Sequence, residues 1–283
     1  MTIGLLWVLL AAVALGVGSL GQATALRATG SGATRHAVLH PLFLAGTAAQ
    51  GVGALAHVVA LQTVSMAVAQ TAVTGSLAVT ALGARLVWGH RLGRRGVAAM
   101  AALAGGLVGL AAVSSDSGGA VAGSTTTLVG LASVTLVLVL GAAAAAGLRA
   151  RHRGGVLALV SGLGFATCSV AIRFLDTSSV GSVITDPVLL VVAAAGAVAG
   201  LTWTVALPHA PVTTVTAVAV VAEVVPPSLL GPWLGDEVGT WFGLVAPLAL
   251  AVAAGAGVVL ARLERPVSAP VPATVPLLTA SHG

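Results

Sequence analysis

The sequence predicts an all-α fold, a polytopic membrane helical bundle of about nine transmembrane helices, from two observations. The 283 residues are 58% hydrophobic and only 7% charged, with a mean hydropathy of +1.09, whereas soluble domains carry about a quarter charged residues. The apolar residues also form continuous runs close to the roughly 20 residues that a helix needs to cross a bilayer. A membrane β-barrel would show short alternating segments instead.

Nine spans follow one another with short connections, at about residues 3–25, 38–61, 66–88, 96–114, 127–148, 154–175, 187–207, 211–234 and 241–262. The first run lacks the basic start of a signal peptide, so we expect it to be a retained helix. Residues 1–114 form a first transmembrane repeat and residues 149–265 a second. Residues 115–148 hold a Gly/Ser/Thr-rich loop and a linking helix, and the proline-rich residues 266–283 are expected to be a disordered cytoplasmic tail.

Arginines indicate the orientation of the spans. All twelve basic residues are arginine. With the N-terminus outside, eleven of them fall on the inner side and only Arg173 falls outside, which is the bias expected of cytoplasmic loops. We therefore expect a multi-pass protein of the cell membrane with its N-terminus outside and its C-terminus in the cytoplasm.

Two halves of the chain resemble each other at an offset of 146 residues. The segment Pro41–Leu61 matches residues 187–207 at nine of 21 positions, and the same offset places residues 16–27 on 162–173 and 88–93 on 234–239. The first four spans therefore correspond to the last four. Because corresponding spans are five apart, they cross in opposite directions, and an inverted repeat of this kind is typical of secondary transporters.

A family resemblance lies in the turns between the third and fourth spans of each half, W-G-H-R-L at residues 88–92 and L-G-D-E-V at residues 234–238. Each turn precedes an apolar helix, and the first of these helices is Gly-rich. This pattern resembles the drug/metabolite transporter superfamily of EamA type, whose turn usually reads L-G-E-x-L; Gly235 and Glu237 keep part of it, while His90 replaces the acid in the first half. The nine-span layout is most similar to the NIPA-type branch, and the resemblance implies a transporter, with magnesium among its expected substrates.

Glu223 is the acidic residue placed well inside a predicted span, where a carboxylate costs about 2.5–3.5 kcal/mol to insert. Thr213 and Thr216 share its helical face. Pro226 and Pro227 lack N–H groups, so two carbonyl groups of this span lose their helical partners. We expect an oxygen-rich pocket that binds a cation or carries a proton, with Glu223 as the candidate metal ligand. The alternative is a neutral Glu223 bonded to a neighbouring helix, with the prolines only bending the span.

Gln50 and His57 are seven residues apart on one face of the second span, and Gln70 aligns with Thr216 in the repeat. These three residues complete the predicted substrate-binding set. The alternative for each is packing or interhelical hydrogen bonding, and for Gln22 on the first span interhelical bonding is the expectation. The glycine pairs Gly105/Gly109 and Gly196/Gly200 are expected to bring helices close together.

The predicted function is secondary transport of a small cation, magnesium included, or of a small metabolite, by alternating access. One alternative is a non-transporting membrane scaffold or accessory protein; another is a membrane-embedded enzyme, for which no catalytic constellation is found. We therefore expect no enzyme and no catalytic residues. The single cysteine, Cys168, excludes an internal disulfide, and no cofactor is expected. The expected partners are the lipid bilayer and the substrate, not nucleic acid, and the sequence leaves a homodimer open.

Overall fold

The structure is a computed structural model that describes residues 2–29, 39–88, 94–113, 121–206, 209–210, 212–237 and 239–263. Within these ranges the chain is helical and contains no strand. The predicted tail, residues 266–283, lies outside the described residues. So do residues 114–120, which begin the predicted Gly/Ser/Thr-rich loop. The helices are α1 (Thr2–Thr29), α3 (Pro41–Thr63), α4 (Met66–Trp88), α5 (Arg94–Val113), α6 (Thr125–Ala145), α7 (Ala150–Ile172), α8 (Val180–Thr185), α9 (Pro187–Ala206), α10 (Val212–Leu230), the 3-10 helix η1 (Gly231–Leu234) and α11 (Phe242–Leu263).

Each predicted span overlaps one long helix of this bundle. By length and composition, six candidate membrane spans are found in the described part of the chain, within α1, α3, α4, α6, α7 and α9. Large apolar side chains remain exposed along these helices, for example Leu136 on α6 and Leu190 on α9. Such surfaces fit contact with lipid, so the chain is a helical, multi-pass membrane protein.

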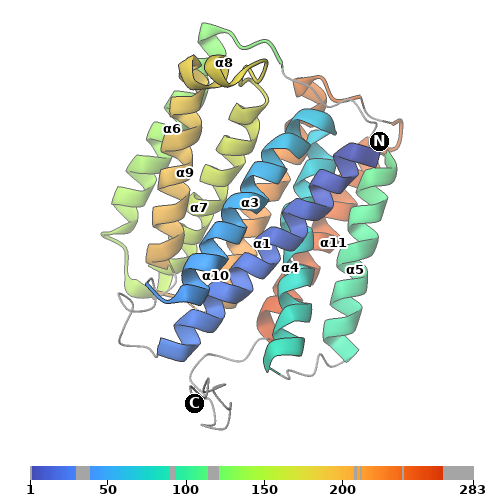
Figure 1. Cartoon of the computed structure of the whole chain (residues 1–283), viewed down its shortest axis with the longest axis vertical. Helices are drawn as coiled ribbons and strands as arrows, with labels where there is room; N and C mark the ends of the chain where they lie inside the picture. Colours follow the sequence, from blue (N-terminus) through green and yellow to red (C-terminus); the bar gives the residue numbers. More distant parts are fainter. Residues whose placement is uncertain are drawn as a thin grey trace, which may run out of the picture.

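The helices pack in two groups that meet along α4, α5, α10 and α11 (Figure 1). In the first group α1 contacts α3 and α4, and α4 contacts α5. In the second group α7 contacts α9 and α10, and α10 contacts α11. The linking helix α6 packs on α7 and α9.

Matching residues start matching helices in the two groups. Helix α3 begins at Pro41 and α9 at Pro187, and proline suits a first helical position because its missing N–H needs no partner there. The residue before each proline caps its helix. His40 Nδ1 accepts the Leu42 N–H at 3.2 Å, and Asp186 Oδ1 accepts the Val188 N–H at 2.8 Å.

Glycines allow the closest helix contacts. A Cβ atom added to Gly16 of α1 would lie 2.6 Å from Val79 Cβ of α4, and one added to Gly162 of α7 would lie 2.7 Å from Ala222 Cβ of α10. Both distances are shorter than Cβ contacts allow, so the two helix pairs approach closely only because these residues are glycine.

The expectation that Gly105/Gly109 and Gly196/Gly200 bring helices together is wrong. Added Cβ atoms at Gly105 and Gly200 would meet nothing within 4 Å, and those at Gly109 and Gly196 would make only ordinary contacts of 4.0 and 3.6 Å. The close packing uses other glycines, because the side of each helix that faces a neighbour is set by the whole bundle rather than by a four-residue spacing.

Helix α10 continues through Pro226 and Pro227, so the span is not interrupted at the prolines. It then tightens into η1, and the next residue, Gly235, has φ 85°. This left-handed backbone conformation favours glycine and turns the chain sharply, which brings Asp236 back toward the bundle.

Candidate functional site

Glu223 lies on α10, a helix surrounded by α4, α7 and α11. The described side chains of α10 between Val215 and Ser228 are buried or half-buried, and none is exposed. Glu223 itself is half-buried, and no hydrogen bond or ion pair to it is found among the described residues. Its carboxyl group is close enough to Cys168 of α7 for a direct electrostatic interaction.

Three buried polar side chains lack hydrogen-bond partners among the described residues. Gln70 on α4 and Ser228 on α10 have 0% exposed surface, and His57 on α3 has 8%. Neither the amide atoms of Gln70, nor the ring nitrogens of His57, nor Ser228 Oγ finds a partner in this part of the chain. An unpaired buried polar group costs about 1–3 kcal/mol, so these side chains are suited to bind a group that the protein itself does not provide.

The packing of α4 on α10 brings part of this set together. The two helices run antiparallel, because Met66 at the start of α4 lies beside Gly231, the residue that follows the end of α10. Val224 packs in one apolar cluster with Ala67 and Val73, the residues three positions before and after Gln70. Gln70 and Glu223 therefore lie at a similar depth in the bundle, Gln70 between two residues of this cluster in sequence and Glu223 next to Val224.

Gln50 is found in a different environment. Its Nε2 donates to Ser19 Oγ at 3.2 Å and to Gln22 Oε1 at 3.4 Å, both on α1, and Gln22 Nε2 donates to Thr47 Oγ1 of α3 at 3.0 Å. The prediction that Gln22 joins two helices is confirmed, and Gln50 takes part in the same α1–α3 network. The backbone of Thr213 and Thr216 belongs to α10, but their side chains lie outside the described part of the structure.

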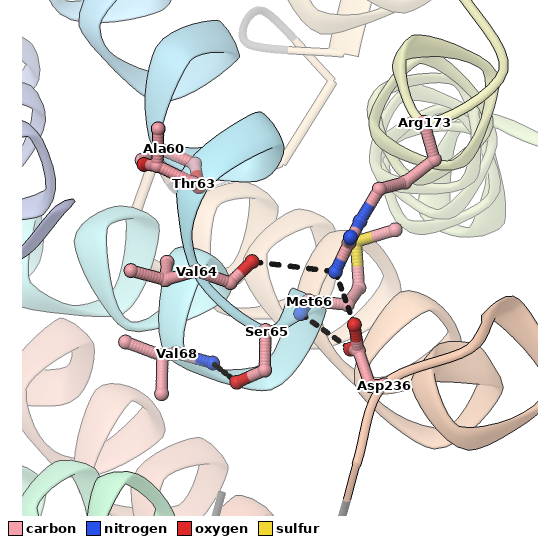
Figure 2. A network of polar contacts seen from close by, with 8 residues as sticks. All are labelled: Ala60, Thr63, Val64, Ser65, Met66, Val68, Arg173 and Asp236. Atoms are coloured by element: carbon pink, nitrogen blue, oxygen red, sulfur yellow. Dashed lines mark hydrogen bonds and ion pairs between the residues drawn. The ribbon is translucent and has the colours of Figure 1, made fainter. Parts of the chain in front are cut away.

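A buried ion pair lies above this polar region, at the end of the bundle where α1 begins (Figures 1 and 2). The Arg173 guanidinium, at the end of α7, pairs with the Asp236 carboxylate, and both side chains are almost fully buried. Arg173 Nη2 also donates to the Val64 carbonyl at 3.3 Å, and Asp236 Oδ2 accepts the Met66 N–H at 2.6 Å. Burial raises the pKa of Asp236, while Arg173 and the Met66 N–H oppose that rise. We call this set of four residues, Arg173, Asp236, Val64 and Met66, the clamp.

The unpartnered side chains lie deeper in the bundle than the clamp. Ser228 lies three residues before Gly231, Gln70 four residues after Met66, and His57 seven residues before Val64. With a rise of 1.5 Å per residue, these positions are about 5–10 Å deeper in the bundle than the clamp.

Arg173 and Asp236 are not among the site residues that the sequence predicts. Two signals point to Arg173: it is the exception to the arginine distribution, and the repeat aligns it with Arg27. The exception has a structural cause, because Arg173 is not a solvated loop residue but the buried partner of a carboxylate.

A surface depression of about 550 Å³ lies at the start of α6 and α9, lined in part by Asp176 and Asp186. Both carboxylates serve local structure. Asp176 Oδ1 accepts the Ser178 N–H at 2.9 Å, and Asp186 Oδ2 accepts the Asp176 N–H at 2.8 Å. Within the described residues no three His, Cys, Asp or Glu side chains are placed to hold a metal ion together.

Comparison with known proteins adds no family name. No family model, no curated protein and no solved structure matches this chain.

Proposed function

We propose that this protein is a secondary transporter of the cell membrane that moves a small cation or a small metabolite by alternating access. In this proposal α5, α10 and α11 cross the membrane together with the six candidate spans. The N-terminus lies outside and the C-terminus in the cytoplasm. The observation that carries the proposal is the set of unpartnered buried polar side chains that lie deeper in the bundle than the Arg173–Asp236 ion pair.

An inverted repeat of α1, α3, α4 and α5 against α7, α9, α10 and α11 is supported by equivalent contacts in the two groups. The packing of α1 on α3 and α4 has its counterpart in the packing of α7 on α9 and α10. Gly16 and Gly162, 146 residues apart, make the same kind of close contact with α4 and α10. The antiparallel arrangement of α4 and α10 also fits, because an inverted repeat requires corresponding helices to run in opposite directions.

Alternating access fits the distribution of polar groups. A transporter site near the bilayer midplane needs polar groups that pair with the substrate and not with the protein. Gln70, His57 and Ser228 each offer donor and acceptor atoms, and Glu223 offers a carboxyl group. A scaffold would gain nothing from leaving these groups unpaired, and their positions follow no catalytic arrangement.

The substrate is expected to accept and donate hydrogen bonds, because amide, imidazole, hydroxyl and carboxyl groups are all available. Magnesium remains within this proposal only as a hydrated ion that keeps several water ligands, since Glu223 is the one carboxylate of the set. Membership of the drug/metabolite superfamily likewise remains a proposal that rests on the two turn motifs.

The test is an uptake panel in proteoliposomes with Mg²⁺, other divalent cations, cationic drugs and amino acids. We expect one class to be taken up and Glu223→Gln to lower that uptake at least tenfold. Asp176→Asn, which removes an exposed carboxylate outside the spans, serves as the control and is expected to transport like the parent. Uptake that Glu223→Gln leaves unchanged would show that Glu223 has no part in transport.

A further inference from the structure

The clamp joins the two halves of the molecule at one end. Val64 and Met66 belong to the corner between α3 and α4 in the first half, while Arg173 ends α7 and Asp236 follows η1 in the second half (Figure 2). A further contact lies beside it, where Gln62 Nε2 donates to the Ile172 carbonyl at 2.5 Å. Three hydrogen bonds between described residues thus cross from one half to the other, and all three lie at this end.

These contacts are made by buried groups. Arg173 is 1% exposed and Asp236 is 6% exposed. The Arg173 carbonyl also accepts the Val121 N–H at 2.7 Å, which attaches the segment before α6 to the same point. Removing one partner of a buried pair leaves an uncompensated charge, so this end separates only when the ion pair and its hydrogen bonds break together.

We propose that the clamp is the gate that closes the site from the side of the membrane on which the N-terminus lies, and that Asp236 and Arg173 determine how often this side opens. The inference rests on the proposed function, since a gate requires a site behind it. Separation of the α3–α4 corner from η1 would uncover Ser228 and Gln70, which lie about one turn below the clamp.

The repeat makes the gate one-sided. The positions that correspond to Arg173 and Asp236 are Arg27 and His90. Arginine and histidine cannot form an arginine–carboxylate pair, so the other closed state lacks this stabilisation. The protein is therefore expected to rest with the Arg173 side closed and the opposite side accessible, and a substrate shifts this balance only through tighter binding to one state.

Cysteine accessibility tests the gate without any need for transport. Ser228→Cys is introduced into a Cys168→Ser background, and an impermeant maleimide is applied to each side of sealed vesicles. In the parent we expect slow labelling from the side on which an N-terminal tag is accessible. Asp236→Asn should accelerate labelling from that side at least tenfold, because the neutral amide still accepts the Met66 N–H but no longer pairs with Arg173.

Two further variants keep the result decisive. Asp186→Asn changes a carboxylate at the same end that is not part of the clamp, and it should label like the parent. Arg173→Lys keeps the charge but loses the fork geometry of arginine, and it replaces Asp236→Asn if that variant does not fold. Unchanged labelling in a folded, monodisperse clamp variant would overturn the gate. Accelerated labelling together with no uptake of any compound would leave the opening established and remove the transport proposal instead.

Discussion

Helices α4 and α10 begin 146 residues apart and occupy corresponding positions in the two groups of helices, yet they carry different polar groups. α4 contains Gln70 and no proline. α10 contains Glu223 and two consecutive prolines, and Leu77 of α4 occupies the position that corresponds to Glu223. The clamp lies where the start of one helix meets the end of the other. The two groups of helices thus make equivalent contacts, whereas acidic residues are absent from the first half of the chain, residues 1–114.

The largest expected effect concerns the clamp, whose ion pair has no counterpart within the first half because residues 1–114 contain no acidic residue. Arg173→Ala leaves Asp236 buried and unpaired, so we expect a loss of about 3–5 kcal/mol in the free energy of unfolding. Thermal unfolding in detergent measures this loss. Arg85→Ala, which removes an exposed arginine from the last turn of α4, is the matched control and should cost less than about 1 kcal/mol. Equal losses for both variants would contradict a special role for the pair.

The glycine contacts test whether the two halves share one scaffold. Gly16→Ala and Gly162→Ala each force a methyl group against the neighbouring helix, and each should destabilise the protein by about 1–3 kcal/mol. Gly105→Ala adds a methyl group where nothing lies within 4 Å, so helix propensity alone predicts no loss. Thermal unfolding compares all three. A loss at Gly162 but none at Gly16 would break the equivalence of the halves.

Substitutions of Gln70 and Gln50 distinguish a residue that binds substrate from one that stabilises the fold. Gln70→Leu removes an amide without a described partner, so stability should stay unchanged or rise by up to about 1–3 kcal/mol, while uptake falls. Gln50→Leu removes two hydrogen bonds to α1, so stability should fall by about 1 kcal/mol. Melting temperature and uptake are measured on the same preparations. If Gln70→Leu unfolds more easily and transports normally, Gln70 is a structural residue.

The smallest effect is expected at the exposed loop between α7 and α8. The Ser178 N–H and hydroxyl lower the pKa of Asp176, so the ionised form holds this turn. Its contribution is present above the ordinary aspartate pKa of about 3.9 and is lost as the pH falls through the lowered value. Protection of the Ser178 amide, measured as its exchange rate relative to that of an unstructured peptide at the same pH, should therefore fall in strongly acidic solution and stay constant near neutral pH. Asp176→Asn, which has no charge to titrate, should show no such step.

The positions of the helices follow from the sequence alone. Apolar runs of about 20 residues have little choice in a bilayer other than a helix, because every backbone N–H and C=O must be satisfied within the segment. The offset of 146 residues, the starts at Pro41 and Pro187, and Glu223 as the buried carboxyl candidate could also be read without coordinates. That α10 continues through its prolines could not, since neighbouring helices can support a helix with two missing hydrogen bonds.

Only the tertiary structure decided which hydrogen-bond or ion-pair partner each buried polar side chain has. Gln50 and His57 share a helical face. At the depth of Gln50, α1 provides Ser19 and Gln22 as hydrogen-bond partners. His57 lies about two turns further along α3, where no described side chain bonds it. Arg173 and Asp236 are 63 residues apart, and no local rule joins them. Helix periodicity sets the direction of a side chain, whereas its partner depends on which helix lies opposite at that depth, and only the packing of the whole bundle determines that.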